Sequence, residues 1–332
     1  MKSIFFSMAA IATAAVMMTS CGEVKRGEYV SGSASIYCDD GFKHILEEEI
    51  DVFEYQYKDS SIVPTYVSEG EAVQALMEDK TSAIIVSQDL TTDQRDYIKK
   101  KFKRIVKSKP IAVDAVALIV NKNCPLKDIS MEEIGQLMKG TLTDWSQLAV
   151  NDSAKIKLVF DSQESSTVSY MRSKFLENGK ISDNPNAYAQ KNNAAVFDVV
   201  KNDPTAIGII SVSWLGNNLE KSKQVPMDKR LEEYSKDTEP IKPNLTTEVN
   251  ILKVSNPTED NDFSNIGYLP YQAYINSGEY PLFRTIYMVT TASNSELMKS
   301  FYDFITGFIG QKIISLTGIM PYNVQPRVVE LK

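Results

Sequence analysis

The sequence predicts an α/β protein with two lobes that are joined by two long crossover strands. Segments of strand and helix character alternate along most of the 332 residues, which indicates βαβ units and a mostly parallel sheet. Two apolar segments are too long for a short strand inside one lobe: Pro110 to Asn121 and Tyr280 to Thr290. We expect both to pass from one lobe into the other. A chain of this length has room for about two domains.

The first part of the chain alternates three predicted strands with three predicted helices. In the longest of these helices, Ile45, Ile50, Phe53 and Tyr57 lie near helical spacing. The third helix carries Asp93 near its start, where an acidic side chain suits the unpaired N–H groups. The predicted strands cover residues 34–38, 62–67 and 82–87, and the predicted helices cover residues 42–57, 70–78 and 92–102.

The second part of the chain continues the alternation after the strand at 110–121. Ser130 and Glu133 have capping-box spacing, which predicts a helix over residues 130–140. A polar region with several prolines, residues 217–262, shows no clear pattern. The remaining predictions are strands over residues 155–160, 206–210 and 280–290 and helices over residues 166–176, 195–201, 296–309 and 311–317.

Residues 1–20 have the pattern of a secretory signal peptide. Lys2 supplies a positive start, and the apolar run from Ile4 to Met18 is too short to span a bilayer well. Cys21 follows, which resembles a bacterial lipoprotein signal, in which this cysteine becomes the new N-terminus and carries lipid. The alternative is ordinary secretory cleavage with a leftover cysteine. We expect a protein of the periplasm or cell envelope that is anchored to a membrane through Cys21, with residues 21–32 as a flexible tether.

Composition argues against several classes of function. The net charge of -7 and the pI near 5.1 disfavour a nucleic-acid partner, and the basic run at residues 99–109 is expected to be a solvated helix face. Cys38 and Cys124 permit either one disulfide or two buried free thiols. One histidine and no CxxC pattern make a zinc site or a Cys–His nucleophile pair hard to build. We therefore expect no enzyme, no metal and no cofactor.

The two tryptophans have a structural interpretation. Trp145 and Trp214 are expected to anchor lobe cores.

Polar turns follow several of the predicted strands. Ligands of open parallel sheets bind beyond the carboxyl ends of the strands, where helix starts offer unpaired N–H groups to anions. A cleft between two lobes would bring such turns together. The turns in this position are Asp39-Asp40-Gly41, Ser68-Glu69-Gly70, Ser87-Gln88-Asp89 and the stretch from Asp161 to Thr167, in which Ser165, Ser166 and Thr167 open a helix.

Four segments of the chain together have the order and motifs of a known family. They are PIAVDAVALIVNKNCPLKDISMEEIGQLMKGTLTDWSQL (Pro110 to Leu148), AIGII (Ala206 to Ile210), SGEYPLFRTIYMV (Ser277 to Val289) and GQKIISLTGIMPYN (Gly310 to Asn323). In these segments the chain resembles the periplasmic phosphate-binding component of ABC transporters. The resemblance implies a two-lobed type II periplasmic binding protein fold in which the two crossover strands form a hinge. Lobe 1 would cover residues 33–112, completed by 284–332, and lobe 2 would cover residues 113–283.

The same resemblance implies a function. The protein would be a lipid-anchored, monomeric solute-binding protein that closes its lobes on phosphate or a related small oxyanion and delivers it to an ABC permease in the membrane. The turns that match the family's binding segments supply the candidate ligand-binding residues. These are Asp40, Gly41, Ser68, Glu69, Ser87, Gln88, Asp161, Ser165, Ser166 and Thr167.

The binding turns depart from the family pattern in charge. The family usually has an arginine, three residues and then Ser-Gly-Thr, whereas this chain has Asp161 and then Ser165-Ser166-Thr167. Asp39 and Asp40 replace small hydroxyl residues, Glu69 lies in a turn that is Gly-Ser-Gly in the family, and Gln88 stands where the family has Arg or Asp. At ~5 Å and an effective dielectric near ~20, each carboxylate would repel a unit anion by about 3 kcal/mol.

Other interpretations of these residues follow from that repulsion. Phosphate binding would be weaker or differently organised, and a cationic, zwitterionic or polyhydroxyl ligand is an alternative. A further alternative is an envelope scaffold or sensor that has lost its ligand. Ser165 can also be an N-cap alone, worth about 1 kcal/mol, and Asp39-Asp40-Gly41 can be only a strand-to-helix turn.

Overall fold

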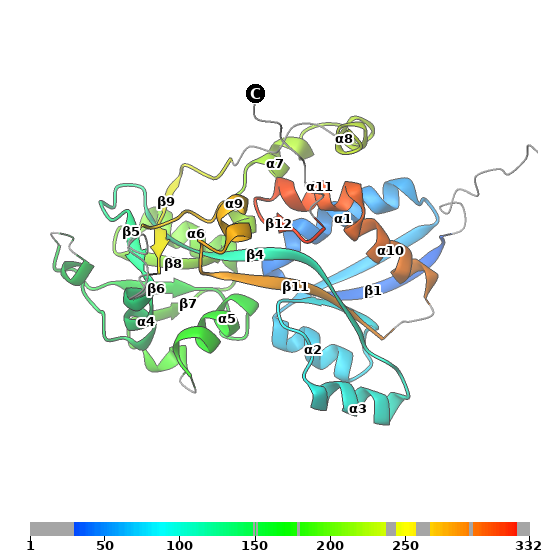
Figure 1. The fold of residues 1–332 in the computed structure, drawn as a ribbon, viewed down its shortest axis with the longest axis horizontal. Coiled ribbons are helices and arrows are strands. Elements are labelled where there is room, and N and C mark those ends of the chain that lie inside the picture. The colour runs from blue at the N-terminus through cyan, green and yellow to red at the C-terminus, as the bar shows by residue number, and fades with distance from the viewer. Residues whose placement is uncertain are drawn as a thin grey trace, which may run out of the picture.

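One long strand, β4 (Lys107–Asn121), runs through both lobes of the molecule (Figure 1). The computed structural model describes residues 30–148, 150, 152–177, 180–236, 244–256, 266–291 and 295–323. The predicted signal peptide, Cys21 and most of the predicted tether lie outside these described residues. In Figure 1 one lobe is drawn mostly in green, and the other mostly in blue, cyan and red.

The described chain alternates strands and helices as the sequence predicts. The strands are β1 (Gly32–Asp39), β2 (Ser60–Val67), β3 (Ala83–Val86), β4, β5 (Asp128–Ser130), β6 (Lys157–Phe160), β7 (Ala187–Ala189), β8 (Ala206–Ser211), β9 (Val249–Ile251), β10 (Lys253–Ser255), β11 (Phe283–Thr290) and β12 (Met320–Pro321). The α-helices are α1 (Lys43–Gln56), α2 (Glu69–Met77), α3 (Thr92–Phe102), α4 (Met131–Lys139), α5 (Ser166–Phe175), α6 (Asn193–Asn202), α7 (Asn218–Lys223), α8 (Met227–Tyr234), α9 (Gln272–Ser277), α10 (Glu296–Thr306) and α11 (Phe308–Leu316). Short 3₁₀ helices cover Asp40–Phe42, Trp145–Leu148, Ile181–Asp183 and Val212–Trp214.

The main sheet is mixed, which corrects the expectation of a mostly parallel sheet. Its strands follow the order β2-β1-β3-β11-β4-β8-β6-β7, with β9 and β12 also paired to β4. Within each lobe the neighbouring strands are parallel, as in β1 with β2 and β3, and in β6 with β7 and β8. The two crossover strands β4 and β11 run antiparallel to all of their partners, because they carry the chain out of one lobe and back into it.

The register of β4 places a joint between the lobes at its centre. Its first half pairs with β11, from Thr290 opposite Lys107 to Phe283 opposite Ala115. Its second half pairs with β8, starting with Ser211 opposite Val116. The residues around position 115 therefore belong to both lobes, and Figure 1 shows β4 and β11 side by side as they cross. The exact lobe boundaries stay a prediction.

Both lobes bury an apolar core on the sheet. Phe42, Phe53 and Phe301 are at most 1% exposed in one lobe, and Trp145 and Phe160 are at most 2% exposed in the other. The buried middle of β4 connects these residues into one cluster. Trp145 is thus a core anchor as expected, whereas Trp214 is only half-buried.

The polar region at 217–262 contributes α7 and α8, which the sequence pattern does not predict. Both helices contact α11, and α8 also packs on α1. Arg230 of α8 donates through Nη1 to both carboxylate oxygens of Glu48 at 2.8 Å, and the Tyr234 hydroxyl donates to the same carboxylate at 3.0 Å. Glu48 has no exposed surface, so this ion pair secures α8 on α1.

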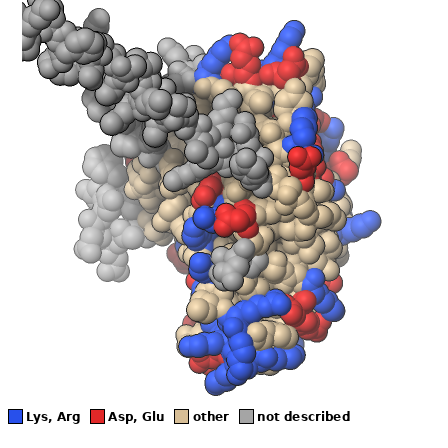
Figure 2. Space-filling model, turned by 90° about the vertical axis from the view of Figure 1, so that its right-hand side faces the viewer, with Lys and Arg blue, Asp and Glu red and all other residues tan. Residues whose placement is uncertain are grey.

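The structure also bears on the predictions for the cysteines, for membrane-spanning helices, for metal ligands and for the basic run. Cys38 and Cys124 are buried free thiols, which settles the alternative that the sequence left open. The part of the chain that the structure describes has no helix long and apolar enough to span a bilayer, and no group of three or more metal-ligating side chains. The basic residues at 99–109 are exposed. Figure 2 shows lysine and arginine side chains gathered at the lower end of the molecule, over α3.

Candidate ligand site between the lobes

The predicted turns meet at a cleft between the lobes. Its volume is about 390 Å³. The cleft is lined from one lobe by Asp39, Asp40, Gly41, Tyr66, Val67, Ser68 and Glu71, and from the other by Asp161, Ser162, Gln163, Glu164, Ser165, Lys191 and Asn192. Five of these side chains are acidic and one is a lysine, so the cleft is negatively charged overall.

The turn from Asp161 to Thr167 forms the start of α5. Ser165 is the N-cap, and its Oγ accepts a hydrogen bond from the Val168 N–H at 3.1 Å. The same hydroxyl donates to Asp161, whose other carboxylate oxygen accepts from the Asn193 amide at 3.1 Å. Asp161 is 3% exposed. Burial raises the pKa of Asp161 to about 7, although its hydrogen bond from Ser165 acts in the opposite direction.

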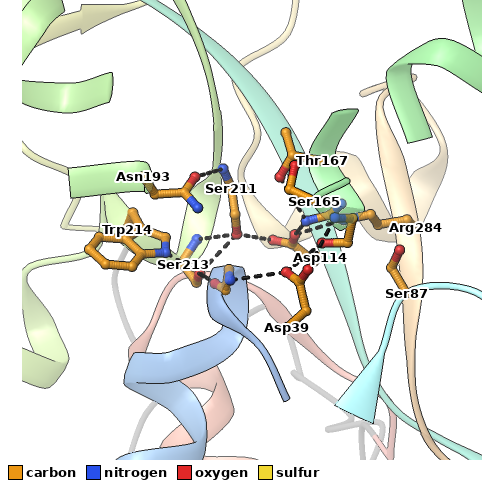
Figure 3. Close-up of polar contacts among 12 residues, drawn as sticks. Asp39, Ser87, Asp114, Ser165, Thr167, Asn193, Ser211, Ser213, Trp214 and Arg284 are labelled. Atoms are coloured by element: carbon orange, nitrogen blue, oxygen red, sulfur yellow. Dashed lines mark hydrogen bonds and ion pairs between the residues drawn. The ribbon is translucent and has the colours of Figure 1, made fainter. Parts of the chain in front are cut away.

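Asp39 reaches the start of α5 from the other lobe. Its Oδ2 accepts from the Ser166 N–H at 3.1 Å, and its Oδ1 accepts from the Ser166 hydroxyl at 2.7 Å. The Gly41 N–H donates to Oδ1 at 3.0 Å. Asp39 and Ser166 are at most 1% exposed. A carboxylate of lobe 1 thus already occupies an anion-binding helix start of lobe 2 (Figure 3).

The serines of lobe 1 bind carboxylates of their own lobe. Ser87 donates its N–H and its hydroxyl to one oxygen of Glu69, the hydroxyl at 2.8 Å. Ser68 is the N-cap of α2 and forms a capping box with Glu71, with 2.9 Å from its hydroxyl to the glutamate. Burial and the nearby Asp39 raise the pKa of Glu69, while the two bonds from Ser87 lower it.

A guanidinium that the sequence analysis did not single out lies beneath these turns. Arg284 of β11 donates through Nε and Nη2 to one oxygen of Asp114 on β4, at 3.1 and 2.9 Å. Its Nη2 also lies 3.3 Å from the Thr167 hydroxyl in the first turn of α5 (Figure 3). Ser211 donates to the second oxygen of Asp114 at 2.9 Å. The sequence contains a signal for this ion pair. Asp114 and Arg284 are each the charged residue inside a predicted apolar crossover strand, and an unpaired buried charge is costly.

Arg284 is a buried cation next to the start of α5. The side chain of Arg284 is 2% exposed, and its Nη1 is buried without a hydrogen-bond partner. Burial raises the pKa of Asp114, against the lowering effect of Arg284. The described cluster holds four buried carboxylates, Asp39, Glu69, Asp114 and Asp161, against this one guanidinium.

A second contact between the lobes lies next to Asp39. The Gly41 carbonyl accepts from the Trp214 indole N–H at 3.0 Å and from the Ser213 hydroxyl at 3.3 Å. A side chain at Gly41 would lie 2.7 Å from the Asp39 carboxylate, so only glycine fits the turn without a shift. Trp214 therefore lies at the interface between the lobes, whereas the sequence predicted it in the core of one lobe.

Five of the ten predicted residues line the cleft: Asp40, Gly41, Ser68, Asp161 and Ser165. The other five, Glu69, Ser87, Gln88, Ser166 and Thr167, lie in the same turns but outside this lining. Glu69, Ser87, Asp161 and the three hydroxyl residues at the start of α5 are buried. Gln88 is exposed, and its amide lies 3.4 Å from the Ser169 hydroxyl across the cleft. Asp40 is partly buried, and burial followed by the charge of Asp39 raises its pKa. Which of these residues contact a ligand stays a prediction.

Two lobes, two crossover strands and polar turns on both sides of a cleft define a two-lobed solute-binding protein. The family model described as "PBP superfamily domain" matches residues 25–307. The chain therefore belongs to the PBP superfamily.

Individual relatives agree with the predicted resemblance. The Phosphate-binding protein PstS of Borreliella burgdorferi is 23% identical over 286 residues, which cover 83% of this chain and 85% of the relative. The Phosphate-binding protein PstS of Pseudomonas aeruginosa is 22% identical over 203 residues, which cover 58% of this chain and 62% of the relative. The resemblance to phosphate ABC transporter binding proteins, predicted from the sequence, is confirmed by these matches.

Solved structures confirm the fold. A Clostridium perfringens protein assigned as a phosphate ABC transporter substrate-binding protein, with bound phosphate, superimposes with a TM-score of 0.68 at 22% identity, over 88% of this chain and 100% of that chain. An ABC-type phosphate transport receptor from Vibrio cholerae superimposes with a TM-score of 0.61 at 17% identity, over 87% of this chain and 100% of that chain.

Proposed function

We propose that this protein is the substrate-binding component of an ABC-type uptake system and binds phosphate or a related small oxyanion between its lobes. One observation carries the proposal: the start of α5 already binds an anionic group, the Asp39 carboxylate, through an N–H and a hydroxyl. The relatives named for phosphate binding make phosphate the first ligand to test. No covalent chemistry is part of this function.

The residues around α5 have separate tasks in this proposal. The Ser166 N–H and the hydroxyls of Ser165 to Thr167 supply neutral donors, which bind anions at helix starts without a cation. Arg284 supplies positive charge beneath the first turn, 3.3 Å from Thr167. A protonated oxyanion can donate to the Asp161 carboxylate, so that this acid accepts a hydrogen bond rather than repelling the ligand. Bending of β4 and β11 would open and close the cleft.

The location of the protein is part of the proposal. The charged start, the apolar run and Cys21 support secretion and lipid anchoring in the periplasm or cell envelope, where a monomer would deliver its ligand to a membrane permease. In cells, the Cys21→Ser variant should move from the membrane fraction to the soluble fraction. If it stays with membranes as the unaltered protein does, the lipid anchor is excluded.

Thermal unfolding tests the ligand. The form that lacks residues 1–21 should melt at a higher temperature with phosphate, because a ligand at a hundredfold excess over its Kd stabilises by about 2.7 kcal/mol. Thr167→Val removes a hydroxyl of the first turn of α5 and should weaken this shift. Ser173→Ala is the matched control, since its hydroxyl bonds the Tyr170 carbonyl near the far end of the same helix. No shift up to millimolar phosphate in any variant would refute the proposal.

A second candidate function is a scaffold or sensor on the same fold. The specific observation in its favour is that four serines expected to bind ligand each bind a carboxylate of the chain itself. A scaffold would show the same small-angle scattering profile with and without phosphate, sulfate, sugars or divalent cations. Compaction with any of these would exclude it.

A further inference from the structure

Asp39 differs from the other carboxylates that bind a predicted ligand-site serine. In the described part of the chain, Glu69, Glu71 and Asp161 each bind a serine of their own lobe, whereas Asp39 binds Ser166 of the opposite lobe. The two residues are separated by 127 positions in the sequence. Separation of the lobes would therefore break the Asp39 bonds and leave the bonds of Glu69, Glu71 and Asp161 intact.

The Asp39 carboxylate has the contacts of a bound anion. Three donors point at it: the Gly41 N–H, the Ser166 N–H and the Ser166 hydroxyl, at 2.7 to 3.1 Å. The Ser166 N–H belongs to the first residue of α5, where unpaired amides and the helix dipole favour negative charge. The carboxylate and Ser166 are both buried, so the bonds lie away from the solvent that would weaken them.

Two neighbouring features reinforce this contact. The Gly41 carbonyl, two residues from Asp39, accepts hydrogen bonds from Ser213 and Trp214 of the other lobe. In the same first turn of α5, Nη2 of Arg284 lies 3.3 Å from the Thr167 hydroxyl, and its Nη1 is buried without a hydrogen-bond partner. The first turn of α5 thus combines the donors of Ser166 with a guanidinium beside Thr167, which together suit an anion.

We propose that Asp39 is a specificity-determining residue that acts as an internal anion, holding the lobes together at the start of α5 until an oxyanion displaces it. The ligand part of this inference rests on the proposed function, whereas the lobe-holding part does not. A tethered carboxylate competes at a high effective concentration, in the millimolar range for short tethers. If Asp39 occupies the donors for about 99% of the time, the apparent affinity for an oxyanion falls about a hundredfold.

The test compares two substitutions in the same turn. Asp39→Ser removes the carboxylate and leaves a hydroxyl too short to reach Ser166. Asp40→Asn removes the neighbouring charge, which also lines the cleft but whose buried Oδ2 has no hydrogen-bond partner among the described residues. Phosphate binding is measured by calorimetry, and lobe separation is measured by small-angle scattering in phosphate-free buffer. Asp39→Asn, which keeps the shape of the side chain, replaces Asp39→Ser if that variant does not fold.

The expected result separates the two variants. Asp39→Ser should bind phosphate at least tenfold more tightly than Asp40→Asn does, and it should have a larger radius of gyration without phosphate. Equal gains in both variants would show that only charge removal matters and would overturn the inference. An unchanged radius of gyration in Asp39→Ser would also overturn it. Failure of every variant to bind phosphate would refute the proposed function alone, and the scattering result would still decide the role of Asp39.

Discussion

The two walls of the cleft use serine in the same way but with different partners. In lobe 1, Ser87 binds Glu69 and Ser68 binds Glu71, and both bonds stay inside the lobe. At the start of α5 in lobe 2, Ser165 binds Asp161 of its own turn, while Ser166 binds Asp39 across the cleft. Bonds inside one lobe survive opening, and bonds across the cleft do not. Of these four serines, Ser166 is therefore the one whose carboxylate bond breaks when the lobes separate.

The difference also shows where the positive charge acts. Arg284 lies on a crossover strand, pairs with Asp114 on the other crossover strand and contacts Thr167 of lobe 2. The serines of lobe 1 have no such bond to Arg284 among the described contacts. The α5 wall should thus depend more strongly on Arg284 than the α2 wall, where Arg284 acts only through its charge, which lowers the pKa of Glu69.

The largest expected effect comes from removing that cation. Arg284→Met should lower the free energy of unfolding by about 3–5 kcal/mol, because Asp114 would keep a buried charge without its partner. Hydrogen exchange should become faster at the start of α5 and change less at Ser87, which bonds Glu69 rather than Arg284. Chemical denaturation gives the first quantity and amide exchange the second.

A surface pair and a double variant serve as controls. Lys157→Met breaks an exposed ion pair with Asp203 and should cost less than about 1 kcal/mol. Replacing both members, Arg284→Met with Asp114→Leu, should be less damaging than Arg284→Met alone, because no buried charge is left unpaired. If Arg284→Met affects both walls equally, the comparison between them is wrong.

The next effect concerns pH and the Asp161 turn. The folded protein holds the Asp161 proton up to a pKa of about 7, while the unfolded chain releases it near ~4. Between these values a rise in pH ionises the unfolded state and not the folded one, so the stability due to this group falls with rising pH and levels off above about 7. The loss amounts to at most about 4 kcal/mol.

Asp161→Asn tests that dependence. This variant should lose the decline in stability between about pH 4 and 7 that is due to Asp161. Glu69→Gln, on the other wall, should retain the Asp161 contribution. Urea unfolding at a series of pH values distinguishes the two. If the stability of Asp161→Asn depends on pH as that of the unaltered protein does, Asp161 is not the group with the raised pKa.

Sequence periodicity predicted most of the fold but only part of the site. The strands before each turn, the helix starts and both crossover strands were predictable, because each has an apolar run with turn or capping residues at its ends. The helix α3 matches its predicted bounds, Thr92–Phe102. The prediction missed the short strands β5, β7, β9, β10 and β12 and the helices α7, α8 and α9, because they form through tertiary contacts rather than through a strong local pattern.

The partners of the serines could not be predicted for a related reason. The sequence placed Asp39 and Ser166 in turns at the same cleft, but spacing along the chain does not say which carboxylate meets which hydroxyl across it. The pair of Arg284 and Asp114 depends on the register of β11 against β4, which sets these residues opposite one another. Register follows from tertiary packing, and the residue types alone do not fix it.

The smallest expected effect is on the exposed capping box of α2. Glu71→Ala removes the acceptor of the Ser68 hydroxyl and N–H, and should lower stability by about 0.5–1 kcal/mol, because both groups can turn to water instead. Since the lost bonds lie within lobe 1, the radius of gyration without phosphate should stay that of the unaltered protein. Denaturation and scattering on the same sample measure both. A more open Glu71→Ala variant would mean that bonds inside one lobe also set lobe separation, and the distinction between the two walls would fail.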